Sequence, residues 1–277
     1  MIRRKKRNSL VMAIICLFLS LVTLFPVIWI FMTSLKRPID TVAIPPRFIF
    51  TPTLQNYIEL LTEGTIAFSF YFMNSVVIAG TSTLFSLVIA CFAGYSLARL
   101  RPRGNKTISM GILSARMLPP IVLVVPLFLM FSNIGMLDTR MALIIPYTAL
   151  NIPLATWMMP SYFLDLPEAL EEAALIDGCN WFTAFIRVIA PVSTPGIAAT
   201  GIFSFILSWN DFLLALPLTL TRAVPLPIVA SRVRVDEGIL WGRLGAISII
   251  LILPVVFYTF FAQKYLVSGL TAGSTKG

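Results

Sequence analysis

The sequence predicts an all-α integral membrane protein with six transmembrane helices. Of its 277 residues, 58% are apolar and 12% are charged, about half of the roughly 25% charged fraction of a soluble domain. A helix needs about 20 apolar residues to cross a bilayer, and six charge-free runs come close to or exceed that length: residues 8–35, 64–98, 117–137, 141–164, 188–210 and 244–263. A single segment satisfies its own backbone in lipid only as a helix, and the period-two alternation of barrel strands is absent, so the class is all-α.

The first run, residues 8–35, follows five consecutive basic residues and so has to be compared with a signal peptide. It is longer than the apolar region of a signal peptide, which is about 7 to 15 residues. It also ends in Lys36-Arg37 without a clear small-residue cleavage site. We therefore expect an uncleaved first span.

The second run is long enough for a span and an additional segment. We expect a short interfacial segment over residues 64–72, which are rich in Phe and Tyr as headgroup-level segments are. The span itself should begin near Asn74-Ser75, because these side chains can cap a helix.

The third span should begin near Thr107 and therefore include Arg116. The long side chain of Arg116 is expected to reach back to the membrane interface. Pro119 and Pro120 should kink this helix because proline removes backbone donors.

The distribution of basic residues predicts which side each end faces. With the N-terminus inside, twelve basic residues lie in cytoplasmic segments, eight lie outside and Arg116 lies within a span. This excess agrees with the positive-inside rule. An even number of spans then places both the N-terminus and the C-terminus in the cytoplasm.

Composition also removes several classes of function. The net charge of +9 is spread over the ends of apolar runs and forms no single patch, so nucleic-acid binding is not expected. The absence of histidine removes imidazole bases and imidazole metal ligands. Cys16, Cys91 and Cys179 are far apart and odd in number, which gives neither a disulfide framework nor a metal-ligand spacing. No metal site is predicted.

The polar segment between the fourth and fifth runs predicts two short helices joined by a tight turn. Pro167 suits the first turn of a helix over residues 167–177, and Gly178 stands where a left-handed residue would end it. Asn180 can cap a second helix. In that helix an apolar stripe at helical spacing should pack against the spans; it consists of Trp181, Phe185, Val188 and Ile189. The first helix is then free to contact a partner, and Pro191 and Pro195 break or start the fifth span.

This segment resembles the EAA loop of ABC importer permeases. The resemblance is carried by Glu172-Ala173-Ala174, by Gly178 after three intervening residues and by Pro191 thirteen residues later. The family's Ile-x-Leu-Pro ending is represented here by Val188-Ile189-Ala190-Pro191, which keeps the apolar character but loosens the match. The resemblance implies that this coupling loop, residues 164–191, meets an ATPase from the membrane side. Its coupling residues would be Glu171, Glu172, Ala173, Ala174, Asp177, Gly178 and Pro191.

Other segments are similar to carbohydrate-type permeases of the maltose-permease G-subunit kind. These segments are residues 114–120, 208–212 and the ending 269–277. The resemblance implies a heterodimer with a second permease subunit, two ATPase subunits, an extracytoplasmic solute-binding protein, a carbohydrate substrate and alternating access in a bacterial inner membrane. It divides the chain into residues 1–63, a transmembrane domain over 64–267 and a cytoplasmic tail over 268–277. In that tail Gly273 and Lys276 would help coupling.

The chain itself is not expected to hydrolyse ATP. No G-x-x-x-x-G-K-[ST] loop occurs, and residues 273–277 lack both its spacing and the helix that should follow. We therefore expect no cofactor in this chain and ATP with Mg²⁺ on the partner ATPase subunits.

Polar residues within the runs are candidates for the solute path, because charges in a membrane usually face a bundle interior or a wet cavity. Asp211, with Trp209 and Asn210, falls towards the outer end of the fifth span, where these groups could bind sugar hydroxyls. Helix packing is an equally good explanation of Asp211. Amides and phenols on other spans are weaker candidates: Asn74, Tyr147 and Asn151.

Two other classes of membrane protein fit the sequence less well. A secondary carrier driven by an ion gradient should show buried coupling carboxylates and an internal repeat, but Asp211 is the only acid within a predicted span and no clear repeat is found. A membrane-embedded enzyme without histidine would need a Ser-Lys pair, and no predicted span contains lysine. An importer permease is the better interpretation, although the sequence does not identify the sugar.

Overall fold

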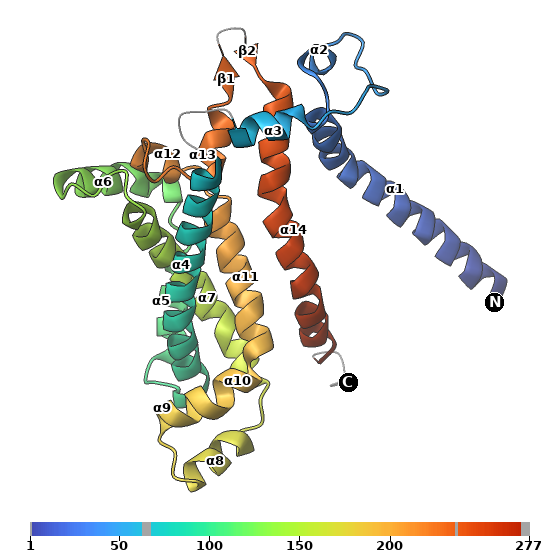
Figure 1. Ribbon diagram of the computed structural model, residues 1–277. Helices are drawn as coiled ribbons and strands as arrows, with labels where there is room; N and C mark the ends of the chain where they lie inside the picture. Colours follow the sequence, from blue (N-terminus) through green and yellow to red (C-terminus); the bar gives the residue numbers. More distant parts are fainter. Residues whose placement is uncertain (1, 63–67, 236–237, 273–277) are drawn as a thin grey trace. The chain divides into compact units, whose positions relative to one another are not determined.

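The computed structural model describes residues 2–62, 68–235 and 238–272 (Figure 1). The chain divides into two compact units. The first comprises Met1–Ser69 with Ala230–Leu253, and the second comprises Phe70–Val229 with Pro254–Gly277.

The first unit is built from helices and one minimal hairpin. Its elements are α1 (Ile2–Ser34), α2 (Pro38–Thr41), α3 (Gln55–Thr62), β1 (Arg234–Val235), β2 (Gly238–Ile239) and the first part of α14 (Trp241–Ala272). Strands β1 and β2 pair antiparallel over two residues each. The predicted all-α class is therefore confirmed apart from this hairpin.

Asn56 joins three helices of the first unit. Its amide nitrogen donates to the backbone oxygens of Ser34 and Lys36, both at 2.8 Å, which satisfies carbonyl groups at the end of α1. A Cβ on Gly242 would lie 2.5 Å from Oδ1 of Asn56, so glycine allows α14 to pass this close. Side chains 12–28 of α1 are exposed and almost all apolar, which is typical of a surface that meets lipid or another protein.

The second unit consists of helices only among its described residues. Its elements are α4 (Phe68–Tyr95) continued by a π turn (Ser96–Leu100), α5 (Asn105–Ala115), α6 (Pro120–Asn133), α7 (Met141–Leu164), α8 (Ala169–Ile176), α9 (Trp181–Ala184) continued by a π turn (Phe185–Ile189), α10 (Ala190–Val192), α11 (Thr194–Trp209), α12 (Ala215–Leu218), α13 (Leu226–Ser231) and the remainder of α14.

Among the described residues, four helices are long and apolar enough to cross a membrane. They cover Met12–Ser34, Phe68–Leu100, Met141–Leu164 and Trp241–Phe260. Two bent pairs raise the number to six if each pair is one span. Helices α5 and α6 meet at 78°, and the segment Trp181–Val192 meets α11 at 80°. The break before α6 lies at the predicted proline kink.

The predicted start of the second span is wrong. Helix α4 already includes residues 68–73 and passes through Asn74 and Ser75 without a cap. These side chains instead hold a distant segment of the same unit. Asn74 Nδ2 donates to the carbonyls of Arg222 and Val224, and Ser75 Oγ accepts from the Leu226 N–H. Residues 64–67 of the expected interfacial segment lie outside the described residues.

Two apolar clusters form the core of the second unit. One gathers Ile78, Phe131, Leu143, Leu214, Leu218 and Ile228, and the other gathers Ala90, Tyr95, Met159, Phe163, Phe185 and Ile189. In Figure 1, α8 and α9 lie at one end of α4, α7 and α11, and α6 and α12 lie at the other. The second cluster therefore supports the end that carries the coupling loop.

Candidate functional site

The coupling loop folds as an elbow whose turn is set by Gly178. This residue has φ of +86°, a left-handed conformation that glycine adopts without steric cost. Its N–H donates to the Leu175 carbonyl at 3.1 Å, and the Cys179 N–H donates to the Ala174 carbonyl at 3.0 Å. These two bonds form a Schellman motif, which ends α8 and satisfies its last carbonyl groups. The predicted left-handed conformation of Gly178 at the end of the helix is confirmed.

The second half of the elbow begins at its predicted cap. Asn180 Oδ1 accepts the Thr183 N–H at 2.9 Å. The helix then passes through the π turn Phe185–Ile189. The expected apolar stripe is only partly present, because Phe185 and Ile189 are buried but Trp181 at the start of α9 is 48% exposed. Pro191 lies in α10, directly before the bend into α11.

Helix α8 has one buried face and one exposed face. Glu171 and Ala174 face inward, and Ala169 at the start of the helix is exposed. The last two turns and the C-cap expose Glu172, Ala173, Ile176 and Asp177. Ile176 is 84% exposed although it is large and apolar. An exposed apolar side chain with carboxylates beside it matches the apolar centre and polar rim of a protein contact surface. We call these four residues the α8 face.

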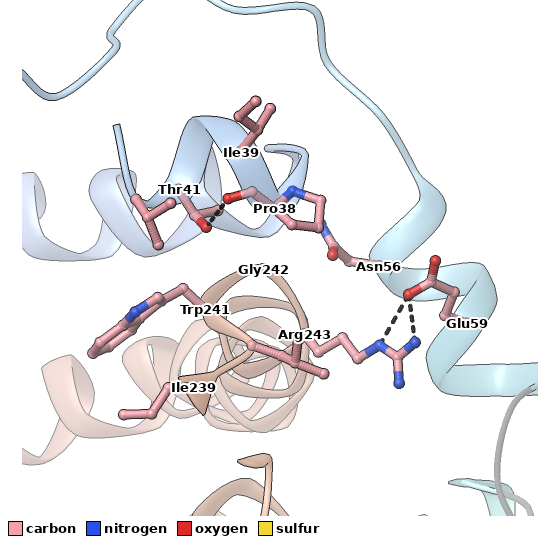
Figure 2. A pocket seen from close by; sticks show the side chains of 11 residues that line it. Pro38, Ile39, Thr41, Asn56, Glu59, Ile239, Trp241, Gly242 and Arg243 are labelled. Carbon is pink, nitrogen blue, oxygen red and sulfur yellow. Dashed lines mark hydrogen bonds and ion pairs between the residues drawn. The ribbon is translucent and has the colours of Figure 1, made fainter. Parts of the chain in front are cut away.

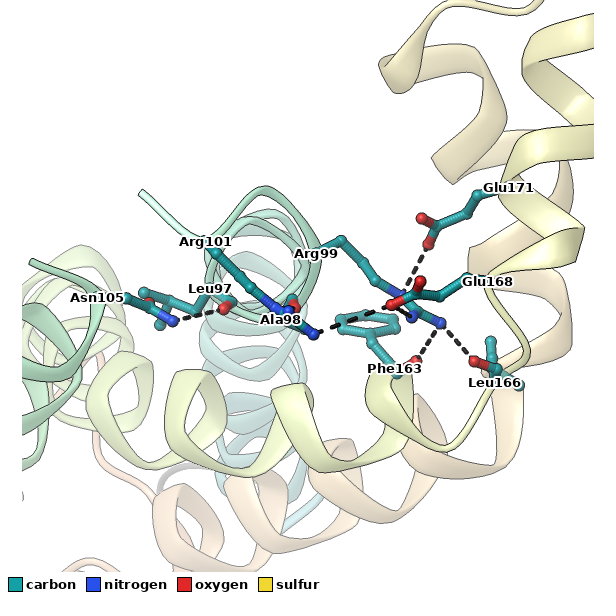
Figure 3. Close-up of polar contacts among 9 residues, drawn as sticks. All are labelled: Leu97, Ala98, Arg99, Arg101, Asn105, Phe163, Leu166, Glu168 and Glu171. Atoms are coloured by element: carbon teal, nitrogen blue, oxygen red, sulfur yellow. Dashed lines mark hydrogen bonds and ion pairs between the residues drawn. The ribbon is translucent and has the colours of Figure 1, made fainter. Parts of the chain in front are cut away.

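Glu171 therefore lies away from the α8 face. Its carboxylate is 3.0 Å from Nε of Arg99, at the end of α4 (Figure 3). Burial raises the pKa of Glu171 above its ordinary value, while the neighbouring Arg99 charge opposes the rise and Glu168 adds to it. Sequence reasoning placed Glu171 with the partner-facing residues, but its side chain is directed into the protein.

A polar pocket of about 120 Å³ lies between α5–α6, α7 and α11. Tyr147 Oη donates to Asp211 Oδ2 at 2.8 Å, and Asn151 Nδ2 donates to Ser208 Oγ at 2.8 Å. The lining also includes Arg116, Pro120, Leu150 and Leu207. Three predicted path residues, Tyr147, Asn151 and Asp211, are thus brought together. The backbone N–H groups of Leu214 and Ala215 also donate to Asp211, which therefore caps the segment after α11 as well.

The other predicted path residues lie elsewhere. Trp209 is 1% exposed and stacks on Phe205 with ring centroids 5.5 Å apart, so it belongs to the apolar core. Asn210 is exposed, and its amide donates to the Ile206 carbonyl of its own helix. Asn74 holds residues 222–224 and accepts from Arg140 Nε at 2.8 Å. Of these three residues, Asn74 is positioned by hydrogen-bonding partners distant in sequence, whereas the Phe205 contact of Trp209 and the hydrogen bond of Asn210 lie within α11 and its end.

Arg116 is a pocket residue that sequence reasoning assigned to the interface. Its Nη1 donates to the Leu150 carbonyl of α7 at 3.2 Å. Because α5 and α6 are separated by a break, Arg116 is the C-cap of α5 and does not lie within a continuous helix. A guanidinium and a carboxylate therefore line the same small pocket.

Asp138 fastens the connection between α6 and α7 to residues 220–223. Its carboxylate accepts the backbone N–H groups of Leu220, Thr221, Arg222 and Ala223 at 2.8 to 3.1 Å. Partial burial acts to raise the pKa of Asp138, but these donors outweigh it and lower the pKa to about 2. The ionised Asp138 carboxylate therefore stabilises the fold of this loop.

A larger pocket, of about 530 Å³, lies within the first unit (Figure 2). Arg243 donates to Glu59 Oε2 from Nε at 2.9 Å and from Nη2 at 2.6 Å. The hydrogen bonds from Arg243 lower the pKa of Glu59. Thr41, Asn56 and Gly242 also line the pocket, and its apolar lining residues are Pro38, Ile39, Val42, Ile239, Leu240 and Trp241. The sequence offered no signal for this pocket, because its walls come from segments about 200 residues apart.

The structure adds three residues to the candidate functional residues: Arg99, Arg116 and Ile176. A signal for Ile176 exists, since it lies four residues after Glu172 and therefore on the same face of a helix. Gly273 and Lys276 lie outside the described residues. No group of three or more possible metal ligands occurs in the part of the chain that the structure describes.

Comparison with known proteins identifies the family. Residues 86–271 match the family described as binding-protein-dependent transport system inner membrane component. The trehalose/maltose transport system permease protein MalG of Thermococcus litoralis is 37% identical, covering 98% of this chain and 95% of that protein. The sulfoquinovosyl glycerol transport system permease protein SmoH of Agrobacterium fabrum is 36% identical, covering 92% and 89%.

A solved structure has the same fold. It is a bacterial ABC transporter involved in the import of the acidic polysaccharide alginate, with a TM-score of 0.76 and 24% identity, covering 95% of this chain and 98% of that one. The chain belongs to the family of binding-protein-dependent transport system inner membrane components, the membrane-spanning permeases of ABC transporters.

Proposed function

We propose that this chain is one of two permease subunits of an importer for a carbohydrate or sugar derivative. Two ATPase subunits bind and hydrolyse ATP with Mg²⁺, and an extracytoplasmic binding protein delivers the solute. This chain contributes half of a pathway that opens alternately to the two sides of the membrane. Family membership and the sugar-named relatives support this role.

The observation that carries the proposal is the α8 face on its rigid elbow. The Schellman turn at Gly178 and the Asn180 cap fix the angle between the two halves of the elbow. The second half continues through Pro191 and meets α11 at 80°, with only Ser193 between α10 and α11. A force applied to α8 is therefore transmitted to α11 as a rigid-body movement.

The proposed topology has six spans with both termini in the cytoplasm. It counts α5–α6 as one bent span and the segment from Trp181 to Trp209 as another. The coupling loop then lies on the cytoplasmic side: α8 connects the fourth span to the fifth, and the second half of the elbow leads into the fifth span. The α8 face meets the ATPase there, with Ile176 as an apolar anchor and Glu172 as an acceptor for basic or backbone donors.

Cross-linking tests this contact. Benzoylphenylalanine in place of Ile176 should cross-link to an ATPase subunit when the complete complex is irradiated, because the side chain at this position is exposed on α8. Ile134, 59% exposed at the other end of the second unit, is the control position. Helix α7 has 24 residues and so keeps the two ends about 36 Å apart. Cross-linking to the ATPase from 134 but not from 176 would exclude the proposal.

The pocket around Asp211 is proposed as part of the solute path. Its volume of about 120 Å³ is below the roughly 300 to 1,000 Å³ of ligand pockets. This chain alone therefore does not enclose a sugar, and the second permease subunit would complete the cavity. Asp211, Tyr147 and Asn151 offer hydroxyl-binding groups, and Arg116 offers a cation. Trp209, Asn210 and Asn74 do not line this pocket.

Replacing Asp211 with alanine should lower the solute transport rate about tenfold in the assembled complex, because a hydrogen bond to a charged group contributes about 1.5–3 kcal/mol. Asn210→Ala is the matched control, since its side chain contacts only its own helix. Transport by reconstituted vesicles and co-purification of the subunits should be measured together. If Asp211→Ala abolishes assembly, Asp211 is structural and its place in the path is rejected.

A further inference from the structure

Arg99 places a buried guanidinium group between the ends of α4 and α7 (Figure 3). The side chain is only 4% exposed. Its Nη2 donates to the carbonyl oxygens of Phe163, at 2.8 Å, and Leu166. Residue 167 is proline and offers the Phe163 carbonyl no N–H group four residues on, so this carbonyl accepts from the Leu166 N–H at 3.3 Å and from Arg99. Arg99 thus adds a donor to the end of α7.

The same guanidinium group pairs with the coupling loop. Nε is 3.0 Å from Glu171 Oε1, an ion pair whose angle does not make it a hydrogen bond. Nη1 is 3.4 Å from Glu168 Oε1. Glu171 is 7% exposed, so its negative charge is held in the interior opposite Arg99, whereas Glu168 is 67% exposed and its pair with Arg99 is screened by solvent. The buried pair is therefore the specific connection between α4 and α8.

An aromatic group supports this connection from the side. The ring of Tyr95, one turn before Arg99, lies 4.8 Å from the Phe185 ring and 5.8 Å from the Phe163 ring. Phe185 belongs to the second half of the elbow, and Phe163 to α7. The first half of the elbow is thus held to α4 by charge, and the second half by aromatic packing.

Arg99 also lies in an unusual stretch of backbone. It is the fourth residue of the π turn Ser96–Leu100, and this turn ends at Arg101 with φ of +44°. Single π turns in long helices occur frequently at functional sites. Here the widened turn continues the end of α4, and from it the Arg99 side chain reaches both the end of α7 and α8.

We propose that Arg99 is a positioning residue that fastens α8 to α4 and α7, so that movement of the coupling loop drives these two helices as well as α11. This rests on the proposed function, in which α8 receives the movement of the ATPase. The chain would then transmit that movement through two routes. One passes through Pro191 into α11, and the other passes through the Arg99–Glu171 pair.

The test is the coupling ratio of the complete reconstituted complex, meaning solute transported per ATP hydrolysed. Arg99→Gln should lower this ratio about fivefold, within the range of coupling free energies. Arg99→Lys should fall between Arg99→Gln and the native protein, because lysine keeps the charge but not the fork of donors. Arg103→Gln, which alters an exposed cation of the same segment, should leave the ratio unchanged. Co-purification of each variant with the other subunits of the complex is the control for its assembly.

A native ratio in assembled Arg99→Gln overturns the inference. If that variant is not recovered in the complex, Glu171→Gln replaces it, and a lowered ratio supports the inference while a native ratio overturns it. The cross-link from position 176, in a chain otherwise unchanged, distinguishes failure of the Arg99 inference from failure of the proposed function. If the cross-link reaches the ATPase and the ratio is unchanged, the role of Arg99 alone is rejected. If the cross-link does not reach the ATPase, the proposed function itself is rejected.

Discussion

Replacing Gly94 with alanine is expected to destabilise the packing of α4 on α7 by about 1–3 kcal/mol, the usual effect of overpacking a core. A Cβ at position 94 would lie 2.5 Å from Cβ of Met159 and 3.3 Å from Cδ of Pro160. One of these atoms is bonded directly to the backbone, and the other belongs to a proline ring, so neither can rotate away. The helices must separate instead. Gly94→Leu should lose still more stability.

Gly80→Ala is the matched control in the same helix. Nothing lies within 4 Å of a Cβ at that position. Alanine is a better helix former than glycine, so this variant should be unchanged or more stable by up to about 1 kcal/mol. Thermal unfolding of the purified proteins in detergent measures both effects. Equal midpoints for Gly94→Ala and Gly80→Ala would show that the close approach of α4 and α7 does not limit stability.

Features that depend on neighbouring residues, in the coupling loop and elsewhere, were predictable. The left-handed Gly178, the Asn180 cap and the break near Pro119 and Pro120 follow from local backbone chemistry. Each depends on partners within a few residues. The number and length of the apolar runs likewise predicted a helical membrane protein, because hydropathy is summed along the chain.

Features that depend on distant partners were not predictable. Asn74 has the chemistry of a cap, but its partners are carbonyls about 150 residues away, at Arg222 and Val224. Arg99 could have been an ordinary interfacial cation, and only the fold brings Glu171 and the end of α7 to it. The π turn at Phe185–Ile189 was not predictable either, because the spacing of apolar residues does not show where a helical turn widens.

Glu172→Lys is expected to reduce solute-stimulated ATP hydrolysis at least tenfold. Glu172 is exposed in the first turn of α8, where a carboxylate is favoured by the helix dipole. Reversing an exposed charge costs the isolated chain only about 0.3–1 kcal/mol, so folding should survive. At a protein interface, losing one partner of a hydrogen-bonded charge pair costs about 2–5 kcal/mol, which is sufficient for this loss.

Asp165→Lys is the matched control. Asp165 is also exposed and acidic, but it caps α7 outside the α8 face. A general effect of positive charge near the loop would appear in both variants, whereas loss of the contact should appear in Glu172→Lys alone.

The most direct test of the coupling role is therefore ATP hydrolysis by the reconstituted complex, with and without solute-loaded binding protein. The native chain and Asp165→Lys should be stimulated, and Glu172→Lys should remain near its unstimulated rate. Equal stimulation of all three would contradict the assignment of the α8 face to the ATPase.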